Sequence, residues 1–260
     1  MMLLDEPVTL PRLAVAKAWE WERIGPAHPV IGVVDLWVED DAAARLDDLT
    51  RQVLAEPGFY NLRTNRVTGE FRDLLLAVAN SDAECYGWSA DRHGRDRALL
   101  AVLTGRGRDA VLATVADEQL TLKAIGADQL VRAVVNELPD FPAANINEIT
   151  VPQAEYDRAR SSDSYTLDTR SDYTVTTPAD QLRTIMGSRR EASHQLFVAA
   201  RTGGRRVASM PLTAVDSLDH GRTLTYLRDT PHGDVDIVCG AGHPGYIAGT
   251  LDNTLRLLRG

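Results

Sequence analysis

Short apolar runs separated by turn residues fall into two blocks of the chain, with four runs in each block. The runs span residues 84–91, 98–105, 109–117 and 119–125 in the first block, and 194–201, 206–216, 222–228 and 234–240 in the second. Neighbouring runs this close in sequence can pair only as antiparallel strands, because parallel neighbours need a long crossover. Leu120, Leu122 and Ala124 alternate with polar residues, which is typical of a sheet with one buried face. Each block is therefore predicted to form an antiparallel meander.

Helical periodicity follows each block and also precedes it. Apolar residues recur at steps of three and four over residues 127–138 and again over residues 247–258, so a helix is predicted to close each block. Further helices are expected over residues 40–57, 70–81 and 178–188, where they should cover faces of the sheet.

The two blocks belong to two copies of one plan. Val8-Thr9-Leu10-Pro11 opens the first half as an extended segment followed by a helical stretch, and Ile149-Thr150-Val151-Pro152 opens the second half in the same way. An additional stretch at residues 28–40 has no later counterpart, so the repeat is imperfect. We expect an internally duplicated α+β fold, a single domain over residues 1–260. Its pseudo-repeats, about 1–142 and 143–260, would share one continuous sheet.

Composition narrows the classes of function. The formal net charge of −9 argues against a nucleic-acid partner, because such proteins neutralise phosphates with clustered Lys and Arg. Cys85 and Cys239 lie inside apolar runs and are expected to be buried thiols. No signal peptide or membrane-spanning run is recognised, so a cytoplasmic protein is expected. The segment 161–177, rich in Ser, Thr and Asp, is predicted to be a surface loop or a partly disordered insertion.

The segment from Gly240 to Gly245 has the G-x-G-x-x-G spacing of a dinucleotide-binding turn between a strand and a helix. That motif works in a unit whose second strand carries an acidic residue about twenty positions later. No such strand follows here, so a strand-to-helix turn, with Pro244 at the start of the helix, is the favoured interpretation. No cofactor is expected.

Other candidate chemistry is weak. Cys239, His243 and His232 could suggest zinc, but no fourth ligand is near in sequence, so no metal is expected. Ser89 lies in a predicted strand and not in a nucleophile elbow, so no catalytic residue is expected.

Basic residues gather at two hairpins of this acidic chain, at equivalent places in the two blocks. They are Arg92, His93, Arg95 and Arg97 in the first hairpin, and Arg201, Arg205 and Arg206 in the second. Such residues are either solvated turns or sites that attract and hold an acidic partner. We take them as the candidate partner-binding residues.

Over nearly the full chain, the order and spacing of several segments resemble the EspG family, the secretion-associated chaperones of actinobacterial ESX (type VII) systems. The segments are VTLP, ECYGWSAD, DAVLATVADEQLTLKAI with GADQLVRAVVNELP, and INEITVP. The resemblance implies a pseudo-two-fold central antiparallel sheet flanked by helical bundles, and a cytosolic chaperone without enzymatic activity.

The resemblance also implies a client, the PPE subunit of a PE–PPE-like helical heterodimer, whose apolar tip docks at the C-terminal helices, the sheet and the loop between the second and third strands. Counted from the strand at Val8, that loop falls on Arg92 to Arg97, and an equivalent later region falls on Arg201 to Arg206. The first loop is shorter than is usual for the family. Candidates for an apolar docking patch, which can equally be core, are Leu182, Ile185, Tyr246 and Ile247.

Two other functions remain open at this point. One is a dinucleotide-dependent enzyme that uses the Gly240 to Gly245 turn. The other is a structural scaffold that oligomerises through an exposed sheet edge. The sequence does not decide whether the protein is a monomer or a homodimer.

Overall fold

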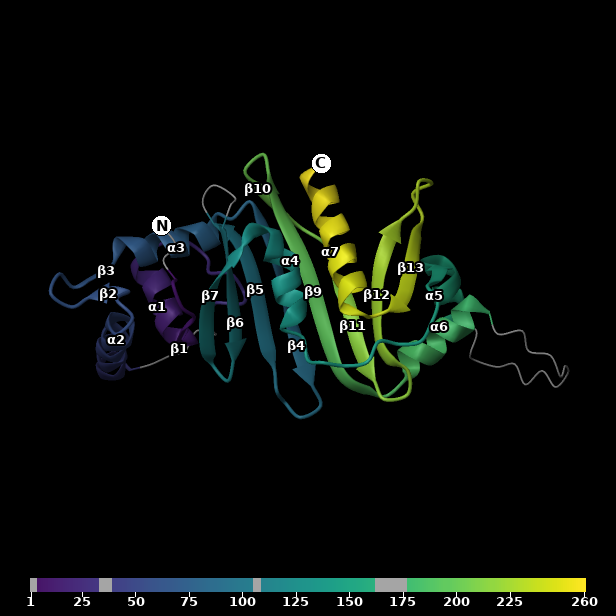
Figure 1. Ribbon diagram of the computed structural model, residues 1–260, viewed down its shortest axis with the longest axis horizontal. Helices are drawn as coiled ribbons and strands as arrows, with labels where there is room; N and C mark the ends of the chain where they lie inside the picture. The colour runs from purple at the N-terminus through teal and green to yellow at the C-terminus, as the bar shows by residue number, and fades with distance from the viewer. Residues whose placement is uncertain (1–3, 33–38, 105–108, 162–176) are drawn as a thin grey trace, which may run out of the picture.

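A computed structural model describes residues 4–32, 39–104, 109–161 and 177–260. The predicted surface segment 161–177 lies outside these residues except at its two ends, as does the middle of the additional stretch 28–40. The described chain forms an elongated body in which helices flank a large sheet (Figure 1).

In the described residues, the sheet has eleven strands, all paired antiparallel. They are β1 (Val8–Pro11), β4 (Ala83–Asp91), β5 (Arg97–Thr104), β6 (Asp109–Ala116), β7 (Gln119–Gly126), β8 (Ile149–Pro152), β9 (Arg190–Thr202), β10 (Arg205–Ala208), β11 (Leu212–Ser217), β12 (Gly221–Asp229) and β13 (Val235–Ala241). A separate hairpin pairs β2 (Tyr60–Asn61) with β3 (Arg66–Val67). Both predicted meanders are confirmed.

The strand order is β1-β7-β6-β5-β4-β9-β11-β12-β13-β8, with β10 paired to β9 beside this path. From the central β4–β9 pair outwards, each side presents its four meander strands in chain order and ends on the short Pro-terminated strand that opens its half. The predicted continuous sheet is therefore present, and the two halves meet at its centre.

The predicted run 206–216 is wrong as a single strand. It forms β10 and β11, which pair with successive parts of β9. Pro211 has no backbone N–H to give to a ladder, so the run breaks before it. At the break, Ser209 donates its backbone N–H to the carbonyl of Val198 (2.8 Å), and its hydroxyl accepts from the N–H of Val198 (3.1 Å).

Helices cover both faces of the sheet. They are α1 (Arg12–Trp21), α2 (Asp40–Ala55), α3 (Gly69–Ala79), α4 (Leu130–Asn136), α5 (Gln153–Ser161), α6 (Pro178–Gly187) and α7 (Pro244–Arg259). The predicted closing helix 127–138 begins as a 3₁₀ turn before α4. In Figure 1, α4 and α7 lie side by side over the middle of the sheet.

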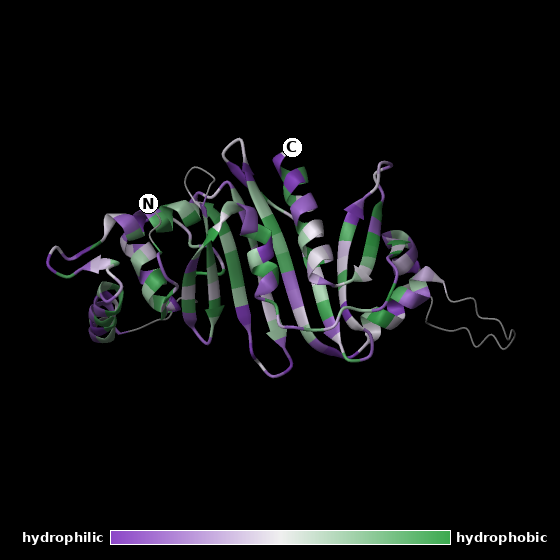
Figure 2. Ribbon diagram, viewed as in Figure 1, coloured by the Kyte–Doolittle hydropathy of each residue, from purple (hydrophilic) through white to green (hydrophobic). Residues whose placement is uncertain are grey.

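Successive residues of each strand face opposite sides of the sheet, so they pack into different hydrophobic cores. Leu99 packs beneath α4 and α7, whereas Leu100 faces the core with α1 to α3. At the far end, Leu224 also faces α7, while its neighbour Thr225 pairs with Cys239, which packs against α5 and α6. One face therefore carries α4 and α7 at its centre, and the other carries a helical group at each end. Figure 2 shows hydrophobic strand interiors between hydrophilic hairpins.

Candidate functional site

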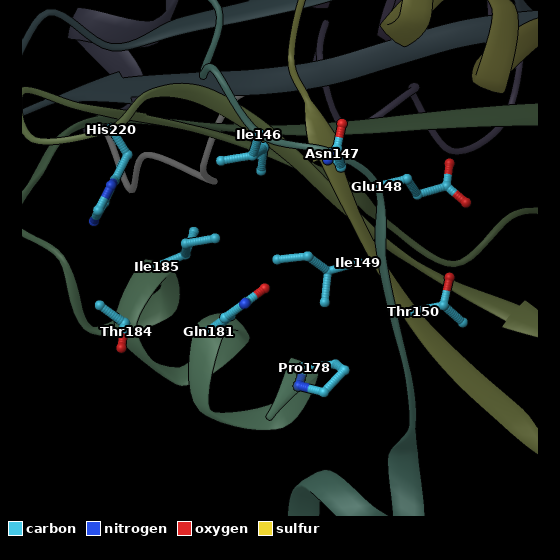
Figure 3. Close-up of a pocket in the computed structure, with 10 residues that line it drawn as sticks. All are labelled: Ile146, Asn147, Glu148, Ile149, Thr150, Pro178, Gln181, Thr184, Ile185 and His220. Carbon is cyan, nitrogen blue, oxygen red and sulfur yellow. The ribbon is translucent and has the colours of Figure 1, made fainter. Parts of the chain in front are cut away.

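An open groove of about 650 Å³ lies between α6 and the segment that leads into β8 (Figure 3). Its lining consists of Ile146, Asn147, Glu148, Ile149, Thr150, Pro178, Gln181, Thr184, Ile185 and His220. Figure 3 shows Ile146, Ile149 and Ile185 pointing towards one another across the gap, while Glu148 and Thr150 point away from it. An apolar floor with a polar rim is the arrangement that an apolar part of another protein can fill.

The wall formed by α6 is fixed at its first turn. The Thr177 hydroxyl accepts from the Asp180 N–H (3.1 Å), and the Asp180 carboxylate accepts from the Thr177 N–H (3.0 Å), which is a capping box. Hydrogen bonds from the hydroxyl and N–H of Thr177 lower the pKa of Asp180. Leu182 is fully buried and so holds α6 on the sheet, which leaves Ile185 to face the groove.

The opposite rim is tied to α7. Glu148 accepts a hydrogen bond from the hydroxyl of Tyr246 at 2.7 Å, and Tyr226 lies 3.4 Å from that hydroxyl. Burial, followed by these two neighbours, raises the pKa of Tyr246. Of the docking residues predicted from the sequence, Ile185 lines the groove and Tyr246 bonds Glu148 at its rim. Leu182 and Ile247 belong to the core.

The first basic hairpin joins β4 to β5, and its residues 92–97 are exposed. Arg92 pairs with Glu191 at 2.6 Å, and Arg95 pairs with Asp91 at 2.7 Å. The backbone N–H groups of Arg95 and His93, with the Arg95 guanidinium, lower the pKa of Asp91. These ion pairs order the loop while leaving its cationic surface open.

Arg97 completes this hairpin at the start of β5. It donates to the carbonyl of Glu137 at 3.5 Å, so it links the hairpin to the end of α4.

The second basic hairpin joins β9 to β10, and its arginines differ in their surroundings. Arg206 grips Glu84 with two hydrogen bonds of 2.9 and 2.8 Å, and Arg201 donates to the carbonyl of Ala79 at 3.0 Å. Arg205 is exposed. Hydrogen bonding to Glu84 raises the pKa of Arg206. Two of the three predicted contact residues therefore also hold the second half of the chain to the first, Arg206 through β4 and Arg201 through the end of α3.

The structure does not bring the two hairpins together. Because β4 and β9 are antiparallel, with Asp91 opposite Ala192 and Ala83 opposite Ala200, the turn after each strand lies beside the start of the other. Nine residues of β4 separate them, or about 30 Å. The groove shares the end of the sheet with the first hairpin, because His220 lies in the turn between β11 and β12 and Ser217 of β11 pairs with Arg190 of β9.

A buried polar chain that sequence analysis missed crosses the sheet on the α4–α7 face. Ser89 Oγ lies 2.8 Å from His194 Nδ1, and His194 Nε2 lies 3.1 Å from Asp216. Arg222 donates to both oxygens of that carboxylate, at 2.5 and 2.8 Å. Although burial raises the pKa of Asp216, bonds from Arg222 and His194 outweigh it and lower the pKa. The sequence signal for this network is that its polar residues occupy strand positions on the same face as apolar neighbours.

This buried network contains a serine, a histidine and an aspartate, but its geometry does not suit acyl transfer. Ser89 is 4% exposed, so a substrate cannot reach its hydroxyl. The Asp216 carboxylate is also engaged by a guanidinium, which leaves it less able to stabilise an imidazolium at His194. The network is therefore a satisfied structural one.

The glycine turn at 240–245 is a strand-to-helix turn, as the sequence favoured. His243 caps α7: its Nδ1 accepts from the N–H of Tyr246 (3.0 Å), and its carbonyl accepts from the N–H of Ile247 (3.1 Å). A Cβ at Gly240 would meet the Tyr246 ring at 3.0 Å. Pro244 has no N–H and the amide of Tyr246 is already bonded to His243, so the start of α7 does not form the row of free amides that a pyrophosphate needs.

Within residues 4–32, 39–104, 109–161 and 177–260, no group of three His, Cys, Asp or Glu side chains could hold a metal ion. Cys85 and Cys239 are free and buried, and burial raises the pKa of both thiols. Among the helices of the described chain, none is long and apolar enough to span a bilayer.

Comparison with known proteins identifies a family and a similar solved structure. A family model described as the EspG family matches residues 11–253. A solved structure, that of the Mycobacterium tuberculosis type VII secretion system chaperone EspG5 in complex with the PE25–PPE41 dimer, is similar with a TM-score of 0.64 and 13% identity, over 96% of this chain and 97% of that chain. No curated protein matches the sequence. At this identity the structural likeness establishes the fold.

Proposed function

The chain belongs to the EspG family, and on that basis we propose that it is a chaperone of a type VII (ESX) secretion system. Its client is the PPE subunit of a PE–PPE-like helical heterodimer, which it keeps soluble and directs to secretion. The observation that carries the proposal is the near-complete overlap with EspG5, a chaperone captured with a PE–PPE dimer.

The groove between α6 and β8 gives this function a physical basis. A client with an exposed apolar helical tip aggregates in water, and covering the tip replaces water on both surfaces. The groove offers three isoleucines for the tip and a rim of Gln181, Thr184 and Asn147 for the polar groups around it. We place the tip in this groove.

The two basic hairpins remain the proposed electrostatic contacts. We assign the larger role to the first, Arg92 to Arg97, because it lies at the groove's end of the sheet and is exposed. The second hairpin, with Arg201, Arg205 and Arg206, would contact a longer part of the client. Rim charges of this kind act mainly on the association rate and its salt dependence.

The remaining parts of the proposal follow from this role. The protein acts without catalysis, and it acts in the cytosol, where a secretion chaperone meets its client before export. It is a single domain whose two pseudo-repeats, about 1–142 and 143–260, correspond to the two sides of the symmetric strand order.

Co-expression tests the proposal. The chain, tagged, is produced with the PE–PPE-like pair encoded beside ESX genes in the same genome. We expect one stable complex to co-purify and the pair to be soluble only in the presence of the chain. Failure of every ESX-linked pair to co-purify would rule out the function, and saturable binding of a dinucleotide by calorimetry would favour the enzyme alternative.

A further inference from the structure

Arg222, at the start of β12, holds the segment that connects the two halves of the chain. Its backbone N–H donates to the carbonyl of Pro142 (2.7 Å), and its carbonyl accepts from the N–H of Ala144 (2.8 Å). Its guanidinium Nη2 donates to the carbonyl of Pro139 at 2.7 Å. One residue thus fixes both ends of the segment 139–144, and its two backbone bonds form the isolated parallel bridge between Ala143 and Arg222.

Two glycines make room for this contact. Gly221 has a φ of +86°, and a Cβ there would lie 2.8 Å from the carbonyl oxygen of Pro142. A Cβ at Gly242 would lie 2.5 Å from Cγ of Arg222. Both distances are shorter than contacts that real side chains make, so any larger residue would displace the segment or the arginine.

The arginine is itself immobilised. It is 3% exposed and binds Asp216 in a bidentate pair. Asp216 is in turn held by His194, whose other ring nitrogen bonds Ser89. This network of side chains spans β12, β11, β9 and β4, so it anchors the Arg222 guanidinium to the centre of the sheet. A fully satisfied buried network of this kind is rigid, because each lost partner leaves a buried charge or polar group unpaired.

The segment that Arg222 holds leads directly into one wall of the groove. Residues 146–150 follow it and line that wall, and His220, which also lines the groove, lies two positions before Arg222. Neither Arg222 nor the residues of its network line the groove. The network therefore acts on the groove only through the backbone that it fixes.

We infer that Arg222, held by Asp216, His194 and Ser89, is a positioning residue that sets the spacing between the β8 wall of the groove and α6, and with it the fit of the client. The inference rests on the proposed function in so far as the groove receives the client. The position of the wall can be measured without one.

The first test measures hydrogen–deuterium exchange of the free protein. Arg222→Lys keeps the charge but removes the planar fork. We expect amides in 139–150 and 217–222 to exchange at least about tenfold faster, while β5, β6 and β7 are unchanged. Arg206→Lys is the matched control for exchange, since it breaks the other bidentate arginine–carboxylate pair at the far end of β9. It should leave 139–150 unchanged.

Unchanged exchange at 139–150 in Arg222→Lys, or an equal rise across the whole sheet, would overturn the inference. Should Arg222→Lys fail to fold, His194→Gln supplies the same comparison, because it interrupts the network without removing the bonds of Arg222 to the segment.

The second test is binding of the purified PE–PPE-like heterodimer by calorimetry. We expect about tenfold weaker binding to Arg222→Lys, because the wall is correctly placed in a smaller fraction of molecules. Equal affinity for both proteins would contradict the inference. If the wild-type protein binds no heterodimer, the proposed function fails, and the exchange experiment still decides whether Arg222 positions the wall.

Discussion

Glu84 joins three segments that are distant in the chain. Its carboxylate lies 3.3 Å from His28 Nε2 and accepts two hydrogen bonds from Arg206. Although burial raises its pKa, His28 and Arg206 lower the pKa to about 2. Arg206 also lies over the ring of Tyr86, at 5.2 Å. Arg206, which the sequence predicts to contact a partner, therefore mainly stabilises the fold.

This arrangement predicts acid-dependent stability. The folded-state pKa of Glu84 lies below its ordinary value of 4.5, so the pair stabilises the fold above that pH and the contribution is lost as pH falls towards about 2. Glu84→Gln should lower the free energy of unfolding by about 3 kcal/mol at pH 7 and progressively less below pH 4.5, by urea unfolding. The exposed control Glu118→Gln should change it by less than about 1 kcal/mol. A pH-independent difference would show that the Glu84 carboxylate is not the source.

Sequence reasoning could not find these pairs. Ser89 and His194 are separated by 105 residues, and Glu84 and Arg206 by 122. No periodicity or spacing rule links residues that far apart. The register of β4 against β9 places Ser89 beside His194, and the pairing of β10 with β9 in addition brings Arg206 to Glu84.

At the scale of elements, the two hairpins differ in what they offer a partner. The first presents Arg92, Arg95 and Arg97 at the groove's end of the strands, whereas the second is about 30 Å away. The sequence placed both correctly between strands, because turn residues separate apolar runs locally. It could not tell that equivalent hairpins lie at opposite ends of the sheet, since that depends on the central β4–β9 pairing.

The difference predicts unequal effects on binding. Replacing Arg95 and Arg97 together with Gln should weaken client binding about fivefold, mainly through a slower association rate whose salt dependence also falls. Arg205→Gln should have a smaller effect in the same direction. Stopped-flow association at two ionic strengths measures both. A larger effect of Arg205→Gln would instead place the client at the second hairpin.

At the scale of the whole molecule, the fold was largely predictable and the groove was not. The alternation of apolar and polar residues and the apolar stripes of helices are local patterns, so they predict the strands, the closing helices and the shared sheet. The groove is assembled from residues 146–150, α6 and His220, which meet only after the far edge of the sheet has formed. Of its lining residues, the sequence had singled out only Ile185 as a docking candidate.

The proposed function depends most on the client occupying this groove, and one comparison of affinities tests this directly. Calorimetry would measure binding of the purified PE–PPE-like heterodimer to the wild-type protein, to Ile185→Asp in the groove, and to Leu257→Asp on the outer face of α7, where Leu257 is 83% exposed. We predict that Leu257→Asp binds like the wild type and that Ile185→Asp, measured well below its melting temperature, binds at least about tenfold more weakly. Wild-type affinity for Ile185→Asp would contradict the placement of the client in the groove.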